Sequence, residues 1–318
     1  MFNINKNSKI LVTGGSGLVG KNLINYLFEI GYKSILYPSS KEVDFTNFNI
    51  ADQYFKKHLP ECVFSLAALV GGIYDNKLRP ADFYWINSQI GNITFHLSQK
   101  YKVKKLICAG AGCGYPLNIK EPLEEKDIWN GLPQLESAAY STAKKTLITQ
   151  SEAYSKQYNL NSSVIIPSNL YGEFDNFNLD KSHVIPALIH KFYIAQRNNK
   201  KVKVWGDGSS KRDFLYISDF VSALEHSMHL NGSNVINVAS GKQFSIRNVC
   251  DLLNEITGGG CKIEYDIKMP SGQKSREFSL QKSKLVLPNW TCKHNLKTGL
   301  ENTYKWFVDN YSLNKVRV

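Results

Sequence analysis

Short apolar runs rich in β-branched residues alternate with amphipathic stretches along the first half of the chain. Strands that alternate with helices predict an α/β fold, namely a Rossmann-type doubly wound parallel sheet. Patterns that predict helices occur at Ala51–Lys57, Asn87–Gln99 and Ala138–Gln157. The runs that predict strands are Lys9–Thr13, Ser34–Tyr37, Cys62–Ala67, Lys105–Ala109 and Val164–Pro167.

This alternation stops near Gly172. Beyond it, short strands are predicted at Val202–Trp205 and Val235–Val238, and helices at Asp219–Met228 and Ile246–Glu255. We therefore expect residues 1–172 to form a dinucleotide-binding domain. Residues 173–318 are expected to form mainly a smaller mixed α/β substrate lobe, from which some segments can cross back.

Composition sets the broad class of the protein. The 318 residues are 42% hydrophobic and 21% charged, which is typical of a globular chain long enough for two lobes. No run approaches the roughly 18 apolar residues that a membrane span needs, and the start has no apolar signal core, so we expect a cytoplasmic protein. The six cysteines form no CxxC pair, which argues against a disulfide scaffold and against a metal site.

The formal net charge of +12 is spread along the chain with acidic residues interleaved. Only short basic clusters occur, at Lys102–Lys105 and Lys200–Lys203. A nucleic-acid binder would concentrate its charge in a stripe with aromatic residues for stacking. We therefore expect a solvated surface, part of which attracts a small anionic substrate, and no nucleic-acid or membrane partner.

A glycine-rich turn follows the first predicted strand and opens a helix. In this context Gly14 permits a tight turn, Gly17 lets backbone N–H groups approach a pyrophosphate, and Gly20 lets helix and strand pack closely. The N-terminus of that helix would turn its positive end toward the phosphates. The motif predicts dinucleotide binding.

Tyr140 and Lys144 are four residues apart on a predicted helix. Side chains at this spacing project from one face. A lysine charge near the phenol is expected to lower the pKa of the tyrosine toward neutrality. Tyr140 then becomes an acid or base for interconverting a carbonyl and an alcohol, which is the reaction of a nicotinamide cofactor. The alternative is a solvent-facing tyrosine with an incidental lysine.

With these motifs the sequence resembles the extended short-chain dehydrogenase/reductases that act on nucleotide sugars. Further segments resemble the GDP-L-fucose synthases, which are bifunctional GDP-4-keto-6-deoxymannose 3,5-epimerase/4-reductases. The resemblance covers nearly the whole chain. Its segments are Ala67–Ile73, Arg79–Phe83, Pro167–Gly172, Asp175–Phe177, Ser182–Leu188 and Trp205–Gly208.

The resemblance implies roles for four catalytic residues. Tyr140 would give a proton to the C4 oxygen as hydride arrives, while Lys144 tunes it and holds the nicotinamide ribose. Cys113 and His183 match the pair that removes and returns protons at C3 and C5, which the C4 ketone acidifies. The alternatives are a buried thiol that only packs, and a loop histidine with a structural role.

The resemblance also implies binding residues. Asp44 would meet the adenine, Asn169 the substrate and Lys191 its diphosphate, although Lys191 and Arg212 could equally be surface cations. Substrate contacts would come from Asn169, Lys191, Trp205, Arg212 and Arg276. Cofactor contacts would come from Gly14, Gly17, Leu18, Val19, Gly20, Asp44, Ala67, Tyr140, Lys144, Pro167, Asn169, Leu170 and His183.

The pattern breaks at Ala111. Relatives place a serine or threonine there to bind the reacting oxygen beside the catalytic tyrosine. A missing donor to a developing alkoxide costs about 2.7–4 kcal/mol of barrier if nothing substitutes. Reduction could continue with Tyr140 alone, the protein could only epimerise, or the substrate could be another deoxyhexose or a heptose.

The choice of cofactor rests on the end of the second predicted strand. An acid there would bind a ribose 2′-OH and indicate NAD(H), but no acid precedes Glu42. Ser39, Ser40 and Lys41 could instead hold a 2′-phosphate. We expect NADP(H), with NAD(H) as the alternative, although the arginines by which GDP-L-fucose synthases resemble NADPH users are absent here.

The leading hypothesis is a nucleotide-sugar epimerase/reductase acting on a GDP-4-keto-6-deoxy sugar by C3/C5 epimerisation and NADPH-dependent C4 reduction. The alternatives are an enzyme that only reduces C4 or only epimerises a related GDP-deoxyhexose or heptose, and a non-catalytic Rossmann dinucleotide sensor. The apolar faces of Asn87–Gln99 and Ala138–Gln157 suggest a homodimer.

Overall fold

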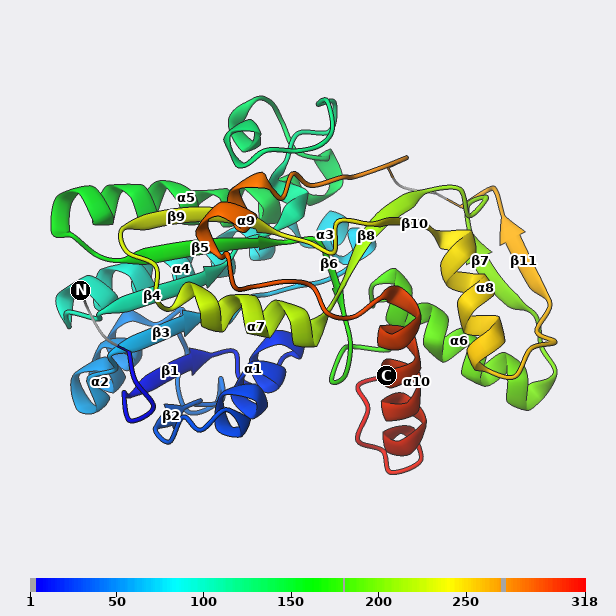
Figure 1. Cartoon of the computed structure of the whole chain (residues 1–318), viewed down its shortest axis with the longest axis horizontal. Helices are drawn as coiled ribbons and strands as arrows, with labels where there is room; N and C mark the ends of the chain where they lie inside the picture. Colours follow the sequence, from blue (N-terminus) through cyan, green and yellow to red (C-terminus); the bar gives the residue numbers. More distant parts are fainter. Residues whose placement is uncertain (1–3, 180, 270–272) are drawn as a thin grey trace.

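The computed structural model describes residues 4–179, 181–269 and 273–318 (Figure 1). Its larger lobe is a six-stranded sheet with helices on both faces, and a smaller lobe of short strands and helices lies beyond one end of these strands. The predicted Rossmann-type doubly wound fold with a smaller mixed lobe is confirmed.

The main sheet has the order β2-β1-β3-β4-β5-β9, and every neighbouring pair is parallel. The strand order reverses between β1 and β3, which makes the carboxyl ends of these two strands the switch point where such sheets bind ligands. The strands are β1 (Ile10–Thr13), β2 (Ile35–Leu36), β3 (Cys62–Ser65), β4 (Lys105–Ala109), β5 (Ser162–Pro167) and β9 (Ser233–Val238).

Both faces of the main sheet are covered, so its central strands are apolar on both sides. Val12 and Phe64 point into the core shared with α1 and α7, whereas Leu11 and Val63 point into the core shared with α2, α4 and α5. The helices are α1 (Leu18–Glu29), α2 (Phe48–His58), α4 (Pro80–Lys100), α5 (Ala138–Tyr158) and α7 (Ile217–Ser227).

The smaller lobe is built from two small sheets and three helices. β6 (Asn169–Tyr171), β8 (Lys211–Tyr216) and β10 (Gln243–Ser245) form one sheet, and β7 (Val202–Trp205) and β11 (Ile263–Asp266) form the other. The helices are α6 (Val184–Asn198), α8 (Ile246–Ile256) and α10 (Leu296–Tyr311). Short elements complete the fold: α3 (Ile73–Leu78), α9 (Gln281–Val286) and the 3₁₀ turns η1 (Gly112–Gly114), η2 (Glu125–Trp129) and η3 (Leu135–Ser137).

Two segments of the second half cross back to the larger lobe. β9 pairs with β5 over its whole length, from Ser162 opposite Ser233 to Pro167 opposite Val238. α7 packs against α1 on one face of the sheet (Figure 1). The strand predicted at 235–238 is therefore an edge of the main sheet and not part of the smaller lobe.

Two observations bear on expectations from composition. No helix in the part of the chain that the structure describes has the length and apolar character needed to cross a bilayer. All six cysteines carry free thiols, three of them buried and three partly buried.

Candidate functional site

The glycine turn lies at the switch point of the sheet. Gly14 has φ +71°, and a Cβ atom there would lie 2.7 Å from the backbone nitrogen of Ala67, which follows β3. A Cβ atom on Gly20 would lie 2.2 Å from the carbonyl oxygen of Gly14, which itself accepts the N–H of Gly17 at 3.1 Å. Only glycine fits at Gly14 and Gly20. The turn therefore brings the N-terminus of α1, at Leu18 and Val19, to the place where a pyrophosphate would sit.

The segment after β2 contains the residues that are predicted to determine the specificity for NAD(H) or NADP(H). The Ser39 hydroxyl donates to Glu42 at 2.7 Å, and with the Ser39 N–H it lowers the pKa of that carboxyl. Ser40 and Lys41 are exposed. Asp44 is also exposed and accepts both the N–H and the hydroxyl of Thr46.

Tyr140 and Lys144 lie on the first two turns of α5, beside the η1 turn that carries Cys113. The Ser141 hydroxyl donates to the Cys113 carbonyl at 3.0 Å and ties the two elements together. The Phe83 ring packs edge-on against Tyr140, with centroids 6.2 Å apart. Cys113 is close enough to affect the pKa values of both Tyr140 and Lys144. Three of the four predicted catalytic residues thus form one group.

Burial controls the charge states of this group. It raises the pKa of Tyr140 well above the ordinary value for a phenol, and the nearby Cys113 adds to the effect. Burial also lowers the pKa of Lys144. The prediction that Lys144 lowers the pKa of Tyr140 is wrong for this structure, because withdrawal from water destabilises the phenolate. Tyr140 is therefore a neutral phenol that can donate a proton.

Ala111 lies immediately before η1 in extended backbone, with φ −147° and ψ 127°. Its carbonyl accepts the N–H of Gly114 at 3.0 Å, which closes the turn around Cys113. Any L-residue can adopt this conformation. The absence of a hydroxyl at Ala111 is therefore not imposed by the backbone.

Arg276 lies near Cys113 and Arg212 lies near Arg276, although the three residues are far apart in the sequence. Burial and the neighbouring Arg276 lower the pKa of Arg212 on β8 to about 10, and Glu121 opposes the shift. Burial likewise lowers the pKa of Arg276, and Cys113 and Glu121 oppose it. The Ser275 hydroxyl donates to Glu121 at 2.7 Å, which holds the arginine segment in place. The cluster presents partly buried positive charge beside the thiol.

Lys191 and Trp205 form a second group on α6 and β7. The Lys191 ammonium donates to the Lys203 carbonyl at 3.0 Å and lies 5.9 Å from the centre of the Trp205 ring. Lys191, Lys200, Lys201 and Lys203 line one hollow of about 180 Å³. This arrangement offers positive charge next to a half-exposed aromatic ring.

The remaining predicted residues lie around the junction of the lobes. Pro167 ends β5, and Asn169 and Leu170 open β6, where the Asn169 amide donates to the Asp213 carbonyl at 3.2 Å. His183 is exposed and precedes α6 without capping it through its side chain. Within the described residues no hydrogen bond joins His183 to Cys113.

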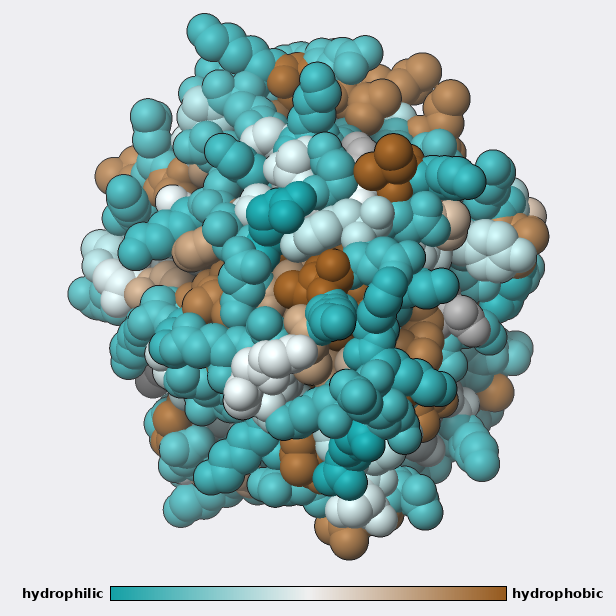
Figure 2. All heavy atoms as spheres, turned by 90° about the vertical axis from the view of Figure 1, so that its right-hand side faces the viewer, coloured by the Kyte–Doolittle hydropathy of each residue, from teal (hydrophilic) through white to brown (hydrophobic). Residues whose placement is uncertain are grey.

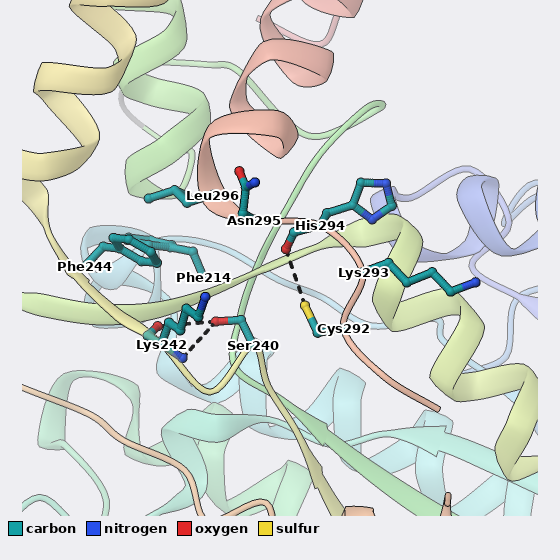
Figure 3. A pocket seen from close by; sticks show the side chains of 9 residues that line it. All are labelled: Phe214, Ser240, Lys242, Phe244, Cys292, Lys293, His294, Asn295 and Leu296. Carbon is teal, nitrogen blue, oxygen red and sulfur yellow. Dashed lines mark hydrogen bonds between the residues drawn. The ribbon is translucent and has the colours of Figure 1, made fainter. Parts of the chain in front are cut away.

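A separate hollow of about 160 Å³ contains none of the predicted residues (Figure 3). The side chains that line it come from β8, the loop between β9 and β10, β10 itself, the start of α10 and the segment before α10. The buried Asp219 holds that segment, because it accepts from the Cys292 thiol and from the backbone of Lys293 and His294. These bonds fix a loop, and we assign no chemistry to this hollow.

Three residues of the site were not predicted from the sequence. Ser141 lies inside the segment read for Tyr140 and Lys144, but its bond to Cys113 depends on tertiary contact. Asp175 lies in one of the segments on which the resemblance rests, but the sequence analysis assigned no role to it. Nothing in the local sequence singles out Glu121.

A glycine turn at the switch point of a parallel sheet, with a Tyr–Lys pair four residues apart on a neighbouring helix, defines the class of extended short-chain dehydrogenase/reductases. Residues 10–239 match the NAD dependent epimerase/dehydratase family, and the chain belongs to this family.

Similar proteins carry related names. Putative GDP-L-fucose synthase 2 of Arabidopsis thaliana is 35% identical over 311 residues, which cover 97% of this chain and 94% of that protein. A GDP-L-fucose synthetase from Naegleria fowleri, solved with NADP bound, matches with a TM-score of 0.90 at 26% identity over 100% of this chain and 98% of that one. A GDP-mannoheptose C4 reductase from Campylobacter jejuni, also with NADP, matches with a TM-score of 0.88 at 28% identity, covering 96% of this chain and 100% of that one.

Proposed function

We propose that the protein converts a GDP-4-keto-6-deoxy sugar by epimerisation at C3 and C5 and by NADPH-dependent reduction at C4. The observation that carries the proposal is that Cys113 lies with Tyr140 and Lys144 in one group. A thiol that can move a proton and a phenol that can donate one thus share a site. The names of the relatives support the same reaction.

The chain's own residues supply the proton transfers. One of Cys113 and His183 removes the proton from a carbon next to the C4 ketone, and the other returns a proton to the opposite face. The nicotinamide supplies hydride to C4 when it is bound. Tyr140 gives its phenolic proton to the C4 oxygen, for which its raised pKa keeps it protonated. Lys144 holds the nicotinamide ribose.

The glycine turn supports binding of a dinucleotide, with Gly14, Gly17 and Gly20 around the pyrophosphate. We propose NADP(H), with Ser40 and Lys41 toward the 2′-phosphate, because the Ser39 hydroxyl is held by Glu42. The bound NADP in both solved relatives supports this choice. A lower dissociation constant for NADPH than for NADH, measured by fluorescence titration, is expected.

The two basic groups support an anionic substrate. Arg212 and Arg276 suit the diphosphate next to Cys113, because both guanidinium groups are partly buried and such groups bind phosphate in a bidentate manner. Lys191 also suits the diphosphate, which is the role that the resemblance implies for it, and Trp205 beside it suits the nucleotide end. The smaller lobe, residues 173–318 without α7 and β9, would then hold the GDP-sugar, and residues 1–172 the cofactor.

We also propose a cytoplasmic homodimer. Part of the apolar faces of α4 and α5 is used within the chain, where Phe95 stacks near Tyr154 with centroids 5.7 Å apart. Tyr74, Tyr84 and Trp85 on α3 and α4 stay exposed, and Trp85 is 61% exposed. The smaller lobe turns a mainly hydrophilic face to the solvent, with only small apolar areas (Figure 2). A monomer in sedimentation at micromolar concentration would exclude the dimer.

The experiment that tests the reaction is mass spectrometry of the product formed from GDP-4-keto-6-deoxymannose with NADPH in deuterated water. The proposal expects NADPH consumption together with solvent deuterium at C3 and C5. Reduction without deuterium would leave a C4 reductase, and deuterium without reduction would leave an epimerase. If neither occurs with this or other 4-keto sugars, the protein is a dinucleotide sensor.

Ala111 favours one alternative, an enzyme limited in its reduction step. Because the backbone at Ala111 accepts a serine, Ala111→Ser restores the missing donor without rebuilding the turn. The hydroxyl is expected to speed C4 reduction by about 10²–10³-fold if the wild type lacks a substitute. Ala111→Gly, which adds no donor, is the matched control. An unchanged rate would mean that the substrate or a water already fills this role.

A further inference from the structure

Asp175 is a buried carboxylate with an unused oxygen. Its side chain lies in the loop between β6 and α6 and is 6% exposed. Oδ1 accepts the N–H of Asn176 at 2.7 Å, whereas Oδ2 has no hydrogen-bond partner among the described residues. Leaving a buried carboxylate oxygen unpaired costs free energy, so a fold that retains one calls for a reason.

The loop around Asp175 is held from both sides. The N–H of Phe177 donates to the Arg317 carbonyl at 2.7 Å, and the Phe177 carbonyl pairs with the His190 ring at 2.8 Å. These bonds anchor the loop to the end of the chain and to α6. They hold the backbone next to Asp175 in place.

Two basic side chains, His183 and Arg317, lie near Asp175. Burial raises the pKa of its carboxyl to about 6, while His183, the Asn176 N–H and Arg317 hold it down. The Arg317 guanidinium is already engaged, because it donates to the Phe174 carbonyl. The His183 imidazole neither caps α6 nor forms a hydrogen bond among the described residues. No hydrogen bond joins His183 to Oδ2 in this structure, but His183 is the neighbouring basic side chain that no other bond among the described residues holds in place.

We propose that Asp175 is the positioning residue of His183, with Oδ2 accepting the N–H of one imidazole nitrogen so that the other nitrogen faces the sugar. The inference rests on the proposed function, in which His183 moves a proton at a sugar carbon. A carboxylate acceptor fixes the tautomer of an imidazole and stabilises the imidazolium that forms when it takes up a proton. The carboxylate stays ionised throughout, and the proton travels only between carbon and imidazole.

The first test measures His183 itself and needs no substrate. Histidine side chains are titrated by NMR, and the His183 signal is assigned with His183→Asn. In Asp175→Asn the pKa of His183 is expected to fall by about half a pH unit or more, because an opposite charge is removed. Glu173→Gln is the matched control, since that carboxylate accepts the Tyr216 hydroxyl in the same loop. An unchanged pKa of His183 in folded Asp175→Asn overturns the proposal.

The wild-type protein gives a second measurement if Asp175→Asn fails to fold. Nitrogen-15 spectra of neutral His183 should show one dominant tautomer, as expected for a ring with one fixed N–H acceptor. The mixture of tautomers seen for a free imidazole would contradict the proposal.

The activity test asks whether Asp175 acts through His183. Asp175→Asn is expected to slow solvent deuterium incorporation about tenfold or more, and Asp175→Asn with His183→Asn should be no slower than His183→Asn alone. If the double variant incorporated deuterium more slowly than His183→Asn, by the factor that Asp175→Asn alone causes, Asp175 would have a merely structural role. This result would overturn the proposal. If the wild type incorporates no deuterium, the proposed function fails, and the NMR titration still decides the pairing of Asp175 with His183.

Discussion

Lys105 offers a test of how burial sets a charge state in this fold. The side chain lies at the start of β4, fully buried, and its ammonium nitrogen donates to the Ser163 hydroxyl at 2.8 Å and to the Leu230 carbonyl at 2.6 Å. Burial lowers the pKa of Lys105 to about 7. Lys105→Met removes the titrating group and keeps an unbranched side chain of similar length.

The size of the expected stability change follows from the difference between the pKa of Lys105 in the folded chain and its pKa in the unfolded chain. From about pH 7 up to the ordinary lysine pKa of 10.5, the unfolded chain holds a proton on Lys105 that the folded chain lacks. The free energy of unfolding therefore rises with pH, by about 1.36 kcal/mol per pH unit. Because Lys105 is already half deprotonated at pH 7 in the folded chain, the wild type should gain about 2.3 kcal/mol relative to Lys105→Met between pH 7 and 9.

The assay is urea denaturation of both proteins at several pH values between 7 and 9, followed by fluorescence and circular dichroism. Comparing the two proteins cancels other groups, such as the buried thiols of Cys62 and Cys108, that titrate in both. Lys104→Met is the matched control, because Lys104 is exposed and pairs with Glu61 at 2.5 Å. Parallel stability curves for wild type and Lys105→Met would refute the reasoning, since they would mean that Lys105 stays charged when buried.

Four further predictions concern the site. Gly20→Ala should lower the free energy of unfolding by about 1–3 kcal/mol, because its Cβ would lie 2.2 Å from the Gly14 carbonyl. Gly17→Ala meets that oxygen at an ordinary 3.4 Å and should keep thermal stability while weakening NADPH binding in a fluorescence titration. Tyr140→Phe should slow NADPH oxidation by about 10²–10⁴-fold and leave NADPH affinity and deuterium incorporation intact. Arg276→Gln should raise KM for the GDP-sugar about tenfold with a smaller effect on kcat in steady-state kinetics.

The strands of the main sheet could be predicted because each is a short apolar run buried on both faces. The strand at Lys105–Ala109 has the predicted bounds, and the helix predicted at Ala138–Gln157 ends one residue later. The helix predicted from Asn87 begins instead at Pro80. Apolar residues do not recur at helical spacing in its first turn, so the hydrophobic pattern did not predict that turn. The proline at the first helical position marks the start of the helix, but a search for hydrophobic periodicity alone does not detect it.

For the candidate site too, some features could be predicted from the sequence and others could not. Gly14, Gly20 and the Tyr140–Lys144 pair depend on local spacing, so the sequence was enough to predict which residues share a turn or a helix face. The approach of Arg212 and Arg276 to Glu121 joins three segments that are far apart in the chain. A contact between distant segments leaves no pattern in the local sequence, so it could not be predicted.

The path of the chain through β9 has a consequence for biosynthesis. Ser233, the first residue of β9, follows Pro167 at the end of β5 by 66 residues (233 − 167). At ~5–20 residues per second, a ribosome takes roughly 3–13 s to add them. During that interval β5 is an open sheet edge that can pair with another chain. The main sheet is thus completed only after β6, α6, β7 and β8 of the smaller lobe have been synthesised, whereas β10, α8, β11 and α10 follow it.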